Sequence, residues 1–327
     1  MMRVPGRKIL RRAMRPIRRR FFPGTVVLGY HRVADDPWEP LQLQVRSANF
    51  VEQLEVLASM RKLISLSELM RRQAAGEPLE QFAVLTFDDG YADFASTVVP
   101  IATQADVPVT VFVANGCLDG RFWWEELAGL LAPGGQGTPM LDVRITGSET
   151  MRFAGLDQAD TRAEAVNTIG ARLSRAKPDT IEQVLEQVRA WAGPGFAPGA
   201  TGAPMTTTAL AEAARNPLVE VGAHTVSHCF LEGLDVGQQR AEIAGSKTAL
   251  EQIWGRPVEV FSYPNGSYSA ATPPIVRDLG FSCACASMEG SFTRRGDPYL
   301  IPRVWVPDLP GAEFRRWLGN WVAEAAA

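Results

Sequence analysis

Seven short apolar runs, separated by amphipathic segments, constrain the fold of this chain more than any other feature of its sequence. Each run is rich in Val, Ile, Leu and Phe and is bounded by turn residues, which is typical of parallel strands covered by helices on both faces. The predicted strands are residues 25–31, 82–87, 107–114, 219–224, 258–263, 281–286 and 300–306. Strands that alternate with helices in this way predict an α/β fold, either a barrel or a doubly wound sheet.

Amphipathic segments between these runs predict the helices. Ser65 and Glu68 have the spacing of a capping box, and Gly76 can end the helix that they begin. Four other segments have apolar residues at helical spacing: 50–57, 180–191, 238–254 and 314–321. Residues 116–204 interrupt the alternation, because two Gly/Pro-rich patches flank helical segments there. We therefore expect an inserted, partly helical segment at about 116–204, on one rim of a domain that spans residues 23–327.

The charge of the chain is unevenly distributed. Residues 1–22 carry nine Lys or Arg and no acid, whereas the other 305 residues carry 24 basic and 36 acidic side chains. A body with an excess of acid has no electrostatic reason to bind nucleic acid, and we expect no such partner. The basic tail over residues 1–22 is either solvated or lies on an anionic membrane surface.

The compartment is predicted from segments that the sequence lacks. No run reaches the roughly 18 apolar residues of a membrane-spanning helix. The basic N-terminus lacks the apolar segment of about 7–15 residues that defines a secretory signal. Four cysteines in 327 residues do not suggest a disulfide scaffold. These features predict a cytoplasmic protein, with peripheral membrane contact through the basic tail as the alternative.

Two adjacent carboxylates, those of Asp88 and Asp89, follow the run 82–87 and precede Gly90. Successive side chains of a strand point to opposite faces, but a turn at Gly90 can bring both carboxylates into one cavity. Like charges so close raise one of the two pKa values unless a cation lies between them. An Asp-Gly pair after a strand is by itself only a turn signal.

Two of the three histidines, His224 and His228, end the run 219–224 and follow it. If this segment turns helically, both imidazoles face the same way and can bind one metal ion, although surface or capping histidines show the same spacing. With one carboxylate from another strand end, they form a three-ligand zinc site with a position open for water. Zn²⁺ and one Asp leave a charge of +1, which favours an ionised water, and the second Asp can then act as general base.

The remaining candidates lie at other strand ends. His31 ends the first predicted strand and is a candidate general acid. The strand that ends at Tyr263 runs into Pro264-Asn265-Gly266, which is either a plain β-turn or a turn that presents backbone N–H groups to an oxyanion. In a barrel of parallel strands the carboxyl ends of all strands meet at one face, where active sites are built.

The segments Thr86-Phe87-Asp88-Asp89-Gly90 and His224-Thr225-Val226-Ser227-His228 resemble the signature motifs of the polysaccharide deacetylase family (NodB homology, carbohydrate esterase family 4). The resemblance covers about residues 26–306 and implies a distorted (β/α)7-type barrel with the inserted segment on one rim. It also implies a metal-dependent hydrolase that removes an acetyl group from an N-acetylated sugar in a polysaccharide or glycolipid. An O-acetyl esterase on the same scaffold and a catalytically silent carbohydrate-binding protein are the alternatives.

The resemblance implies a role for each motif residue. Asp88 would be the catalytic base, while Asp89, His224 and His228 would hold one divalent ion, with Zn²⁺ preferred. The turn at Tyr263–Asn265 would supply an oxyanion amide.

Two departures from the family pattern need replacements. The family usually has an arginine near Ser262 that orients the catalytic carboxylate, and a late histidine that acts as acid, but no histidine follows His228 here. Tyr30-His31 is similar to an early motif of a branch that deacetylates exported glucosamine polymers. We therefore expect His31 to be the acid and Arg303 to pair with Asp88.

Trp123 and Trp124 lie near the start of the expected insertion. Such aromatic rings either stack on a sugar in the substrate site or pack the insertion against the barrel.

Overall fold

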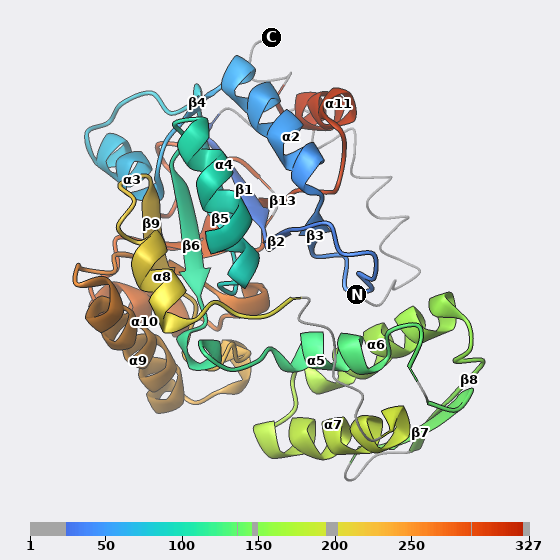
Figure 1. The fold of residues 1–327 in the computed structure, drawn as a ribbon. Helices are drawn as coiled ribbons and strands as arrows, with labels where there is room; N and C mark the ends of the chain where they lie inside the picture. The colour runs from blue at the N-terminus through green and yellow to red at the C-terminus, as the bar shows by residue number, and fades with distance from the viewer. Residues whose placement is uncertain (1–23, 136, 146–149, 194–201, 289, 323–327) are drawn as a thin grey trace. The chain divides into compact units, whose positions relative to one another are not determined.

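The computed structural model describes residues 24–135, 137–145, 150–193, 202–288 and 290–322 (Figure 1). Their contacts divide the chain into two compact units. The first, here called the barrel unit, comprises the described parts of Pro5–Asp35, Gln44–Asp119 and Pro204–Ala327. The second, here called the small unit, comprises Asp36–Leu43 and the described parts of Gly120–Ala203. The predicted basic tail at 1–22 lies outside the described residues.

The barrel unit is built on a sheet of nine described strands, paired in parallel in the order β12-β11-β10-β9-β6-β5-β1-β13, with β4 beside β5. The strands are β1 (Val26–Tyr30), β4 (Lys62–Leu63), β5 (Phe82–Phe87), β6 (Val109–Val113), β9 (Val219–Ala223), β10 (Val260–Ser262), β11 (Cys283–Ala286), β12 (Ile301–Pro302) and β13 (Val304–Trp305). All seven predicted strands are therefore confirmed, although the last is split in two.

The split strand nearly closes the sheet into a barrel. β12 pairs with β11 at one edge and β13 pairs with β1 at the other, and only Arg303 separates them in the chain. The backbone N–H of Arg303 donates to the carbonyl of Met288 at 2.9 Å, outside both ladders. The segment therefore passes from one edge of the sheet to the other, and the predicted distorted (β/α) barrel is confirmed.

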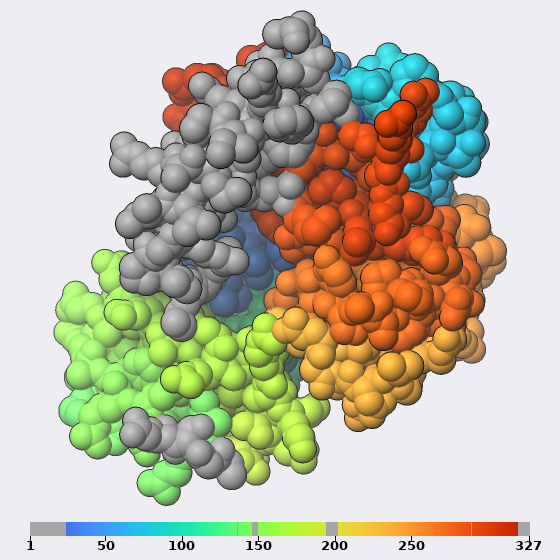
Figure 2. Space-filling model, turned by 180° about the vertical axis from the view of Figure 1, so that it is seen from behind, coloured from blue at the N-terminus to red at the C-terminus, as the bar shows by residue number. Residues whose placement is uncertain are grey.

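Helices surround the strands of the barrel unit, and Figure 1 shows β1, β5 and β6 side by side among them. The helices are α2 (Ser47–Met60), α3 (Leu66–Ala74), α4 (Val99–Gln104), α8 (Thr207–Ala213), α9 (Val236–Trp254), α10 (Thr272–Asp278) and α11 (Gly311–Val322). The predicted cap is present, since the Ser65 side chain accepts from the Glu68 N–H at 3.1 Å, and Gly76 follows α3 with φ of +69°. Two short strands, β2 (Arg32–Val33) and β3 (Gln44–Val45), pair separately. The segments after β10, orange to red in Figure 2, form a large part of the face shown there.

Strand alternation separates the apolar residues of the barrel unit into two clusters. One lies between strands and helices and includes Leu28, Leu85 and Phe261. The other contains their neighbours Val27 and Val84, with Phe112, Val260 and Cys283, and fills the interior of the barrel. Both faces of β1, β5 and β6 are buried, as their continuous apolar sequences predict.

The small unit has its own apolar core. It consists of α5 (Trp123–Leu130), α6 (Ala159–Leu173) and α7 (Pro178–Ala192) with an antiparallel hairpin, β7 (Met140–Arg144) and β8 (Thr150–Ala154). Leu127, Val143, Ile169 and Leu185 are among its fully or nearly fully buried residues. The segment expected as an insertion at about 116–204 overlaps Gly120–Ala203 of this unit. Among the described residues of both units, no helix is long and apolar enough to cross a bilayer.

Candidate active site

The site is built on the interior face of the barrel unit, at the carboxyl ends of its strands. Val84, Thr86 and Asp88 share the interior side of β5 and its extension, because side chains alternate along a strand. By the same rule Ser262 lies two positions after the interior residue Val260 and shares its face, and Arg303 is related to the interior residue Ile301 in the same way. Residues from three distant parts of the chain therefore point into the same end of the barrel.

Arg303 and Asp88 form a buried ion pair, the pair that the sequence led us to expect. Nη1 and Nη2 of Arg303 donate to Oδ1 and Oδ2 of Asp88 at 2.6 Å and 2.8 Å, and neither side chain is more than 4% exposed. Nη2 also donates to Ser262 Oγ at 2.8 Å, so the guanidinium reaches the position near which the family usually has its arginine. Thr86 Oγ1 accepts from Nη1 at 3.3 Å.

The ion pair determines the charge state of Asp88. Burial alone would raise the pKa of Asp88, but the positive charge of Arg303 and the hydrogen bonds that its guanidinium donates outweigh it. The pKa of Asp88 therefore lies below its ordinary value, and the carboxylate is ionised and able to accept a proton.

Asp89 reaches the same end of the barrel through a left-handed turn. Its φ is +72°, and that of Gly90 is +87°, so two successive residues reverse the direction of the chain after β5. A Cβ at Gly90 would lie only 3.0 Å from Val113 Cγ1, and the turn therefore requires glycine. The two carboxylates meet at His224, whose Nε2 lies 3.8 Å from Asp88 Oδ2 and 3.4 Å from Asp89 Oδ1.

Asp89, His224 and His228 converge, with one ligand atom from each lying within 4.8 Å of the others. Asp89 Oδ1 lies 3.4 Å from His224 Nε2 and 3.1 Å from His228 Nε2. His224 Nδ1 lies 2.8 Å from the carbonyl oxygen of Ser262, and because a carbonyl only accepts, Nδ1 carries the proton. In the neutral ring Nε2 then presents a lone pair to the carboxylate oxygen.

This arrangement fits a divalent cation. Asp89 Oδ1 is buried and, among the described residues, has no hydrogen-bond partner, although two imidazole nitrogens face it. His224 Nε2 and Asp89 Oδ1 are two acceptors that face each other without a proton, and a cation between them removes their repulsion. Ligand atoms about 2.0–2.1 Å from a tetrahedral zinc ion lie roughly 3.3 Å apart, close to the two separations observed. The second nitrogen of His224, bonded to a backbone carbonyl, is the support that metal-binding histidines usually have.

The segment after β9 differs from the helical turn that the spacing of the two histidines suggested. Thr225 and His228 have left-handed backbones, with φ of +63° and +56°. The two imidazoles nonetheless meet, with ring centroids 5.1 Å apart. An irregular turn, rather than one turn of helix, therefore brings them together.

His31 lies beside these groups and is half-buried. Its ring stacks on Trp305, with centroids 4.6 Å apart and an interplanar angle of 17°. The pKa of His31 lies below its ordinary value, because burial lowers it more than the carboxylates of Asp89 and Asp88 raise it. His31 is therefore close enough to the cluster to respond to its charge.

In the turn after β10, residues 263–267, one backbone N–H has no acceptor among the residues that the structure describes. The N–H of Tyr263 donates to the Cys285 carbonyl at 3.1 Å, and its hydroxyl donates to the Tyr299 carbonyl at 3.0 Å. The N–H groups of Gly266 and Ser267 also donate within the turn. Pro264 has no N–H, which leaves the amide of Asn265, at φ of +54°, as the candidate oxyanion donor.

Trp123 and Trp124 lie in α5 of the small unit. Trp123 packs against the core of that unit, and Trp124 stacks on Phe122 with centroids 4.7 Å apart.

Two residues of the site were not singled out from the sequence. Trp305 lies beside His31, and its ring also lies 4.7 Å from the Arg303 guanidinium carbon. Thr86 binds the same guanidinium. The sequence could have identified both, because Trp305 lies two positions from Arg303 and Thr86 lies two positions from Asp88. Residues with this spacing on a strand point to the same face.

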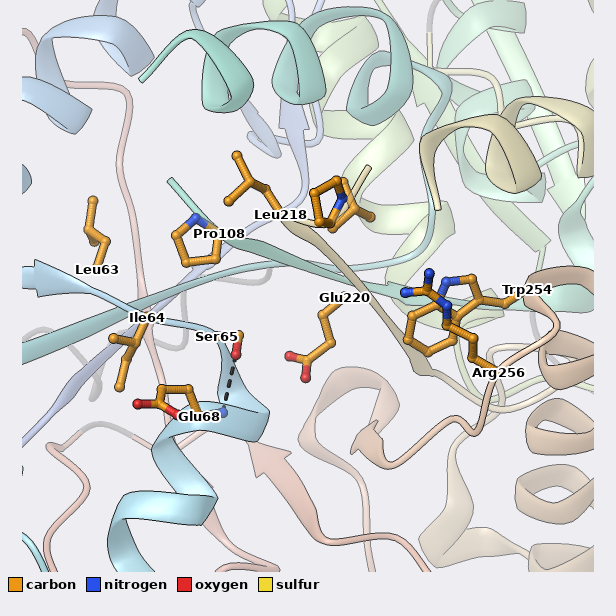
Figure 3. Close-up of a pocket in the computed structure, with 11 residues that line it drawn as sticks. Leu63, Ile64, Ser65, Glu68, Pro108, Leu218, Glu220, Trp254 and Arg256 are labelled. Atoms are coloured by element: carbon orange, nitrogen blue, oxygen red, sulfur yellow. Dashed lines mark hydrogen bonds between the residues drawn. The ribbon is translucent and has the colours of Figure 1, made fainter. Parts of the chain in front are cut away.

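A cavity of about 390 Å³ lies elsewhere in the barrel unit (Figure 3). Its lining includes Pro108 and Leu218, which directly precede β6 and β9, so it is at the amino ends of these strands. Its Glu220 carboxylate accepts from the N–H groups of Leu66 and Ser67, both at 3.1 Å. Glu220 therefore caps α3, and this end of the barrel serves its stability.

Comparison with known proteins points to one family. A family model described as polysaccharide deacetylase matches residues 183–284, a segment that contains His224 and His228 but not Asp88 and Asp89. The Bacillus subtilis (strain 168) protein named "Putative polysaccharide deacetylase YxkH" is 28% identical over 101 residues, which are 31% of this chain and 36% of that protein. The match thus spans about a third of the relative's length.

Three solved structures share the fold. The Streptococcus pyogenes deacetylase PplD in complex with acetate has a TM-score of 0.61 at 18% identity, over 92% of this chain and 99% of that one. IcaB from Ammonifex degensii has a TM-score of 0.60 at 19% identity, over 94% and 99%. The BpsB deacetylase domain from Bordetella bronchiseptica has a TM-score of 0.52 at 17% identity, over 87% and 96%.

The barrel unit thus has a fold shared with these solved structures, among them two that are named as deacetylases. The predicted resemblance to the polysaccharide deacetylase family is confirmed.

Proposed function

We propose that this protein is a metal-dependent hydrolase that removes the acetyl group from an N-acetylated sugar of a polysaccharide or glycolipid. One observation carries the proposal. Asp89 Oδ1, which has no hydrogen-bond partner in the described part of the chain, faces two imidazole nitrogens, beside an Asp88 carboxylate that Arg303 keeps ionised. A cation site next to an ionised base is the arrangement that acyl hydrolysis by water requires.

Asp89, His224 and His228 are the residues that would hold the ion, and two imidazoles with one carboxylate favour Zn²⁺. A bound zinc ion would supply Lewis acidity that polarises the acyl carbonyl and eases the ionisation of water.

The chain's own residues move the protons. Asp88 accepts a proton from the water that attacks the acetyl carbon, and Arg303 holds its two oxygens in place. His31 donates a proton to the sugar nitrogen as the carbon–nitrogen bond breaks, which releases acetate and the free amine. The Asn265 N–H is the candidate donor to the oxyanion, a contribution of about 2.7–4 kcal/mol by comparison with other acyl-transfer sites.

The acid favours an amide over an ester as substrate. An amine leaves an acyl centre only when it is protonated, whereas an alkoxide leaves more readily. His31, stacked on Trp305 beside the two carboxylates, is the candidate donor of that proton, and its position therefore supports N-deacetylation.

Acetate release tests the proposal. Zinc-loaded protein would be incubated with N-acetylated oligosaccharides, nucleotide sugars and lipid-linked sugars, and with O-acetylated saccharides in parallel. We expect acetate and free amine from an N-acetylated substrate, with release abolished by a chelator, restored by Zn²⁺ and absent in Asp88→Asn. Release from the esters alone would show an O-acetyl esterase, and no release from any substrate would favour a binding protein.

A further inference from the structure

The irregular segment that carries His224 and His228 needs support from outside itself. Thr225 and His228, neither of them glycine, both have left-handed backbones. Such conformations cost free energy and persist only where the surrounding structure determines them. His228 supplies one of the three candidate ligand atoms. Whatever fixes this segment therefore also fixes the geometry of the cation site.

Glu242, on α9, provides that support. Its Oε2 accepts from the backbone N–H groups of Val226 and Ser227, both at 2.9 Å. Its Oε1 accepts from Ser227 Oγ, also at 2.9 Å. One carboxylate therefore holds two successive amides and one hydroxyl between the two histidines, with distances typical of strong hydrogen bonds.

Gly116 holds the same segment from another side. Its N–H donates to the Val226 carbonyl at 2.8 Å, and a Cβ at this glycine would lie 2.6 Å from that oxygen. Both polar backbone groups of Val226 are therefore engaged, its N–H by Glu242 and its carbonyl by Gly116. A displacement of Val226 would therefore lengthen one or both of these bonds.

We propose that Glu242 is a positioning residue that fixes His228 and His224 for cation binding. The proposal rests on the proposed metal site, because it assigns Glu242 a function only if the two histidines and Asp89 bind an ion. Glu242 is not one of the three converging ligands, and it would act through the backbone of residues 226–227. Outer residues that orient metal ligands typically contribute about 10–100-fold to metal affinity.

Zinc affinity, measured by competition with a chromogenic chelator, tests this assignment without any substrate. We expect Glu242→Ala to weaken Zn²⁺ binding about 10–100-fold relative to the unaltered chain. Glu242→Gln should restore most of the affinity, because its carbonyl oxygen can accept from both amides and its NH₂ can donate to Ser227 Oγ. Ser227→Ala keeps the two backbone bonds and should lose less than Glu242→Ala.

The chain offers a matched control on the same helix. Glu251 of α9 also accepts a backbone N–H, that of Val258 at 3.0 Å, and its carboxylate pairs with Lys247 at 3.1 Å. Glu251→Ala should lower the unfolding temperature in the same way as Glu242→Ala but leave zinc affinity unchanged. Equal zinc affinity in Glu242→Ala and the unaltered chain, or equal losses in Glu242→Ala and Glu251→Ala, would overturn the positioning role. Failure of the unaltered chain to bind Zn²⁺ would instead overturn the proposed metal site.

Discussion

Replacing Arg303 with Met should destabilise the protein by the cost of leaving one charge buried alone. Arg303 is fully buried, and its guanidinium donates two hydrogen bonds to the Asp88 carboxylate, at 2.6 Å and 2.8 Å. Asp88 itself is only 3% exposed, so water cannot replace the lost partner. Breaking a buried pair by removing one partner costs about 3–5 kcal/mol. At about 2–4 °C per kcal/mol for a large domain, the melting temperature should fall by roughly 6–20 °C.

The pH dependence identifies the cause of this loss. The pKa of Asp88 lies below its ordinary 3.8 because the charge and hydrogen bonds of Arg303 outweigh the effect of burial. In the unaltered chain Asp88 therefore contributes stability above pH 3.8, which is lost as the pH falls through the lowered pKa. Without Arg303, burial raises the pKa, so Asp88 destabilises the protein increasingly as the pH rises. The loss caused by Arg303→Met should thus be larger at pH 7 than at pH 4.

Thermal unfolding of a double-mutant cycle measures the pair directly. Arg303→Met, Asp88→Asn and the double variant would be melted at both pH values, with far-UV circular dichroism as the signal. We expect the double variant to recover about 2–3 kcal/mol relative to the sum of the single losses. Additive losses that do not change with pH would show that the buried pair does not govern the charge of Asp88.

Three further outcomes follow from the site and the sequence. His31→Ala should lower kcat by about 10²–10⁴-fold while zinc content stays constant, and near-normal turnover would defeat its assignment as the acid. Gly90→Ala should cost more than about 1 kcal/mol in urea unfolding, since φ is +87° and the new Cβ would lie 3.0 Å from Val113 Cγ1; an unchanged midpoint would contradict the need for glycine in this turn. A chain without residues 1–22 should lose salt-sensitive co-sedimentation with phosphatidylserine vesicles, and equal binding with and without the nine cationic side chains would exclude the tail as a membrane contact.

Most of the barrel could be predicted from sequence because its strands are long apolar runs. β5 has the predicted bounds, 82–87, and β1, β6, β9, β10, β11, β12 and β13 are shortened versions of the other predicted runs. The split at Arg303 could not be predicted, since it depends on a hydrogen bond to Met288, whose position only the fold determines. Two-residue strands such as β4 carry too few residues for any periodicity.

Which segments make up the small unit could not be predicted either, because it depends on contacts between residues far apart in the sequence. Residues 36–43 precede the expected insertion by many residues, yet Trp38 Nε1 donates to the Ala128 carbonyl at 2.9 Å. The hairpin of β7 and β8 was missed although β7 alternates exposed and buried residues, because that alternation spans only five residues.

Some residues of the site can be identified from a sequence motif, whereas others can be identified only from the fold. Asp88, Asp89, His224 and His228 stand out because rare polar residues directly follow apolar strands. Glu242 lies in the middle of a helix, where a glutamate is ordinary, and nothing in its neighbourhood marks its bonds to residues 226–227. The role of Asn265 rather than Tyr263 as the candidate amide donor likewise depends on the pairing of Tyr263 with Cys285.

The zinc content of purified variants tests the central claim most directly. After dialysis against Zn²⁺ and removal of the free ion, elemental analysis should find one ion per unaltered chain and per Asp88→Asn chain. Asp89→Asn and His228→Ala should retain far less, because each loses one of the three converging ligand atoms. A chain that holds no zinc, or one in which Asp88→Asn loses the ion while Asp89→Asn keeps it, would contradict the account.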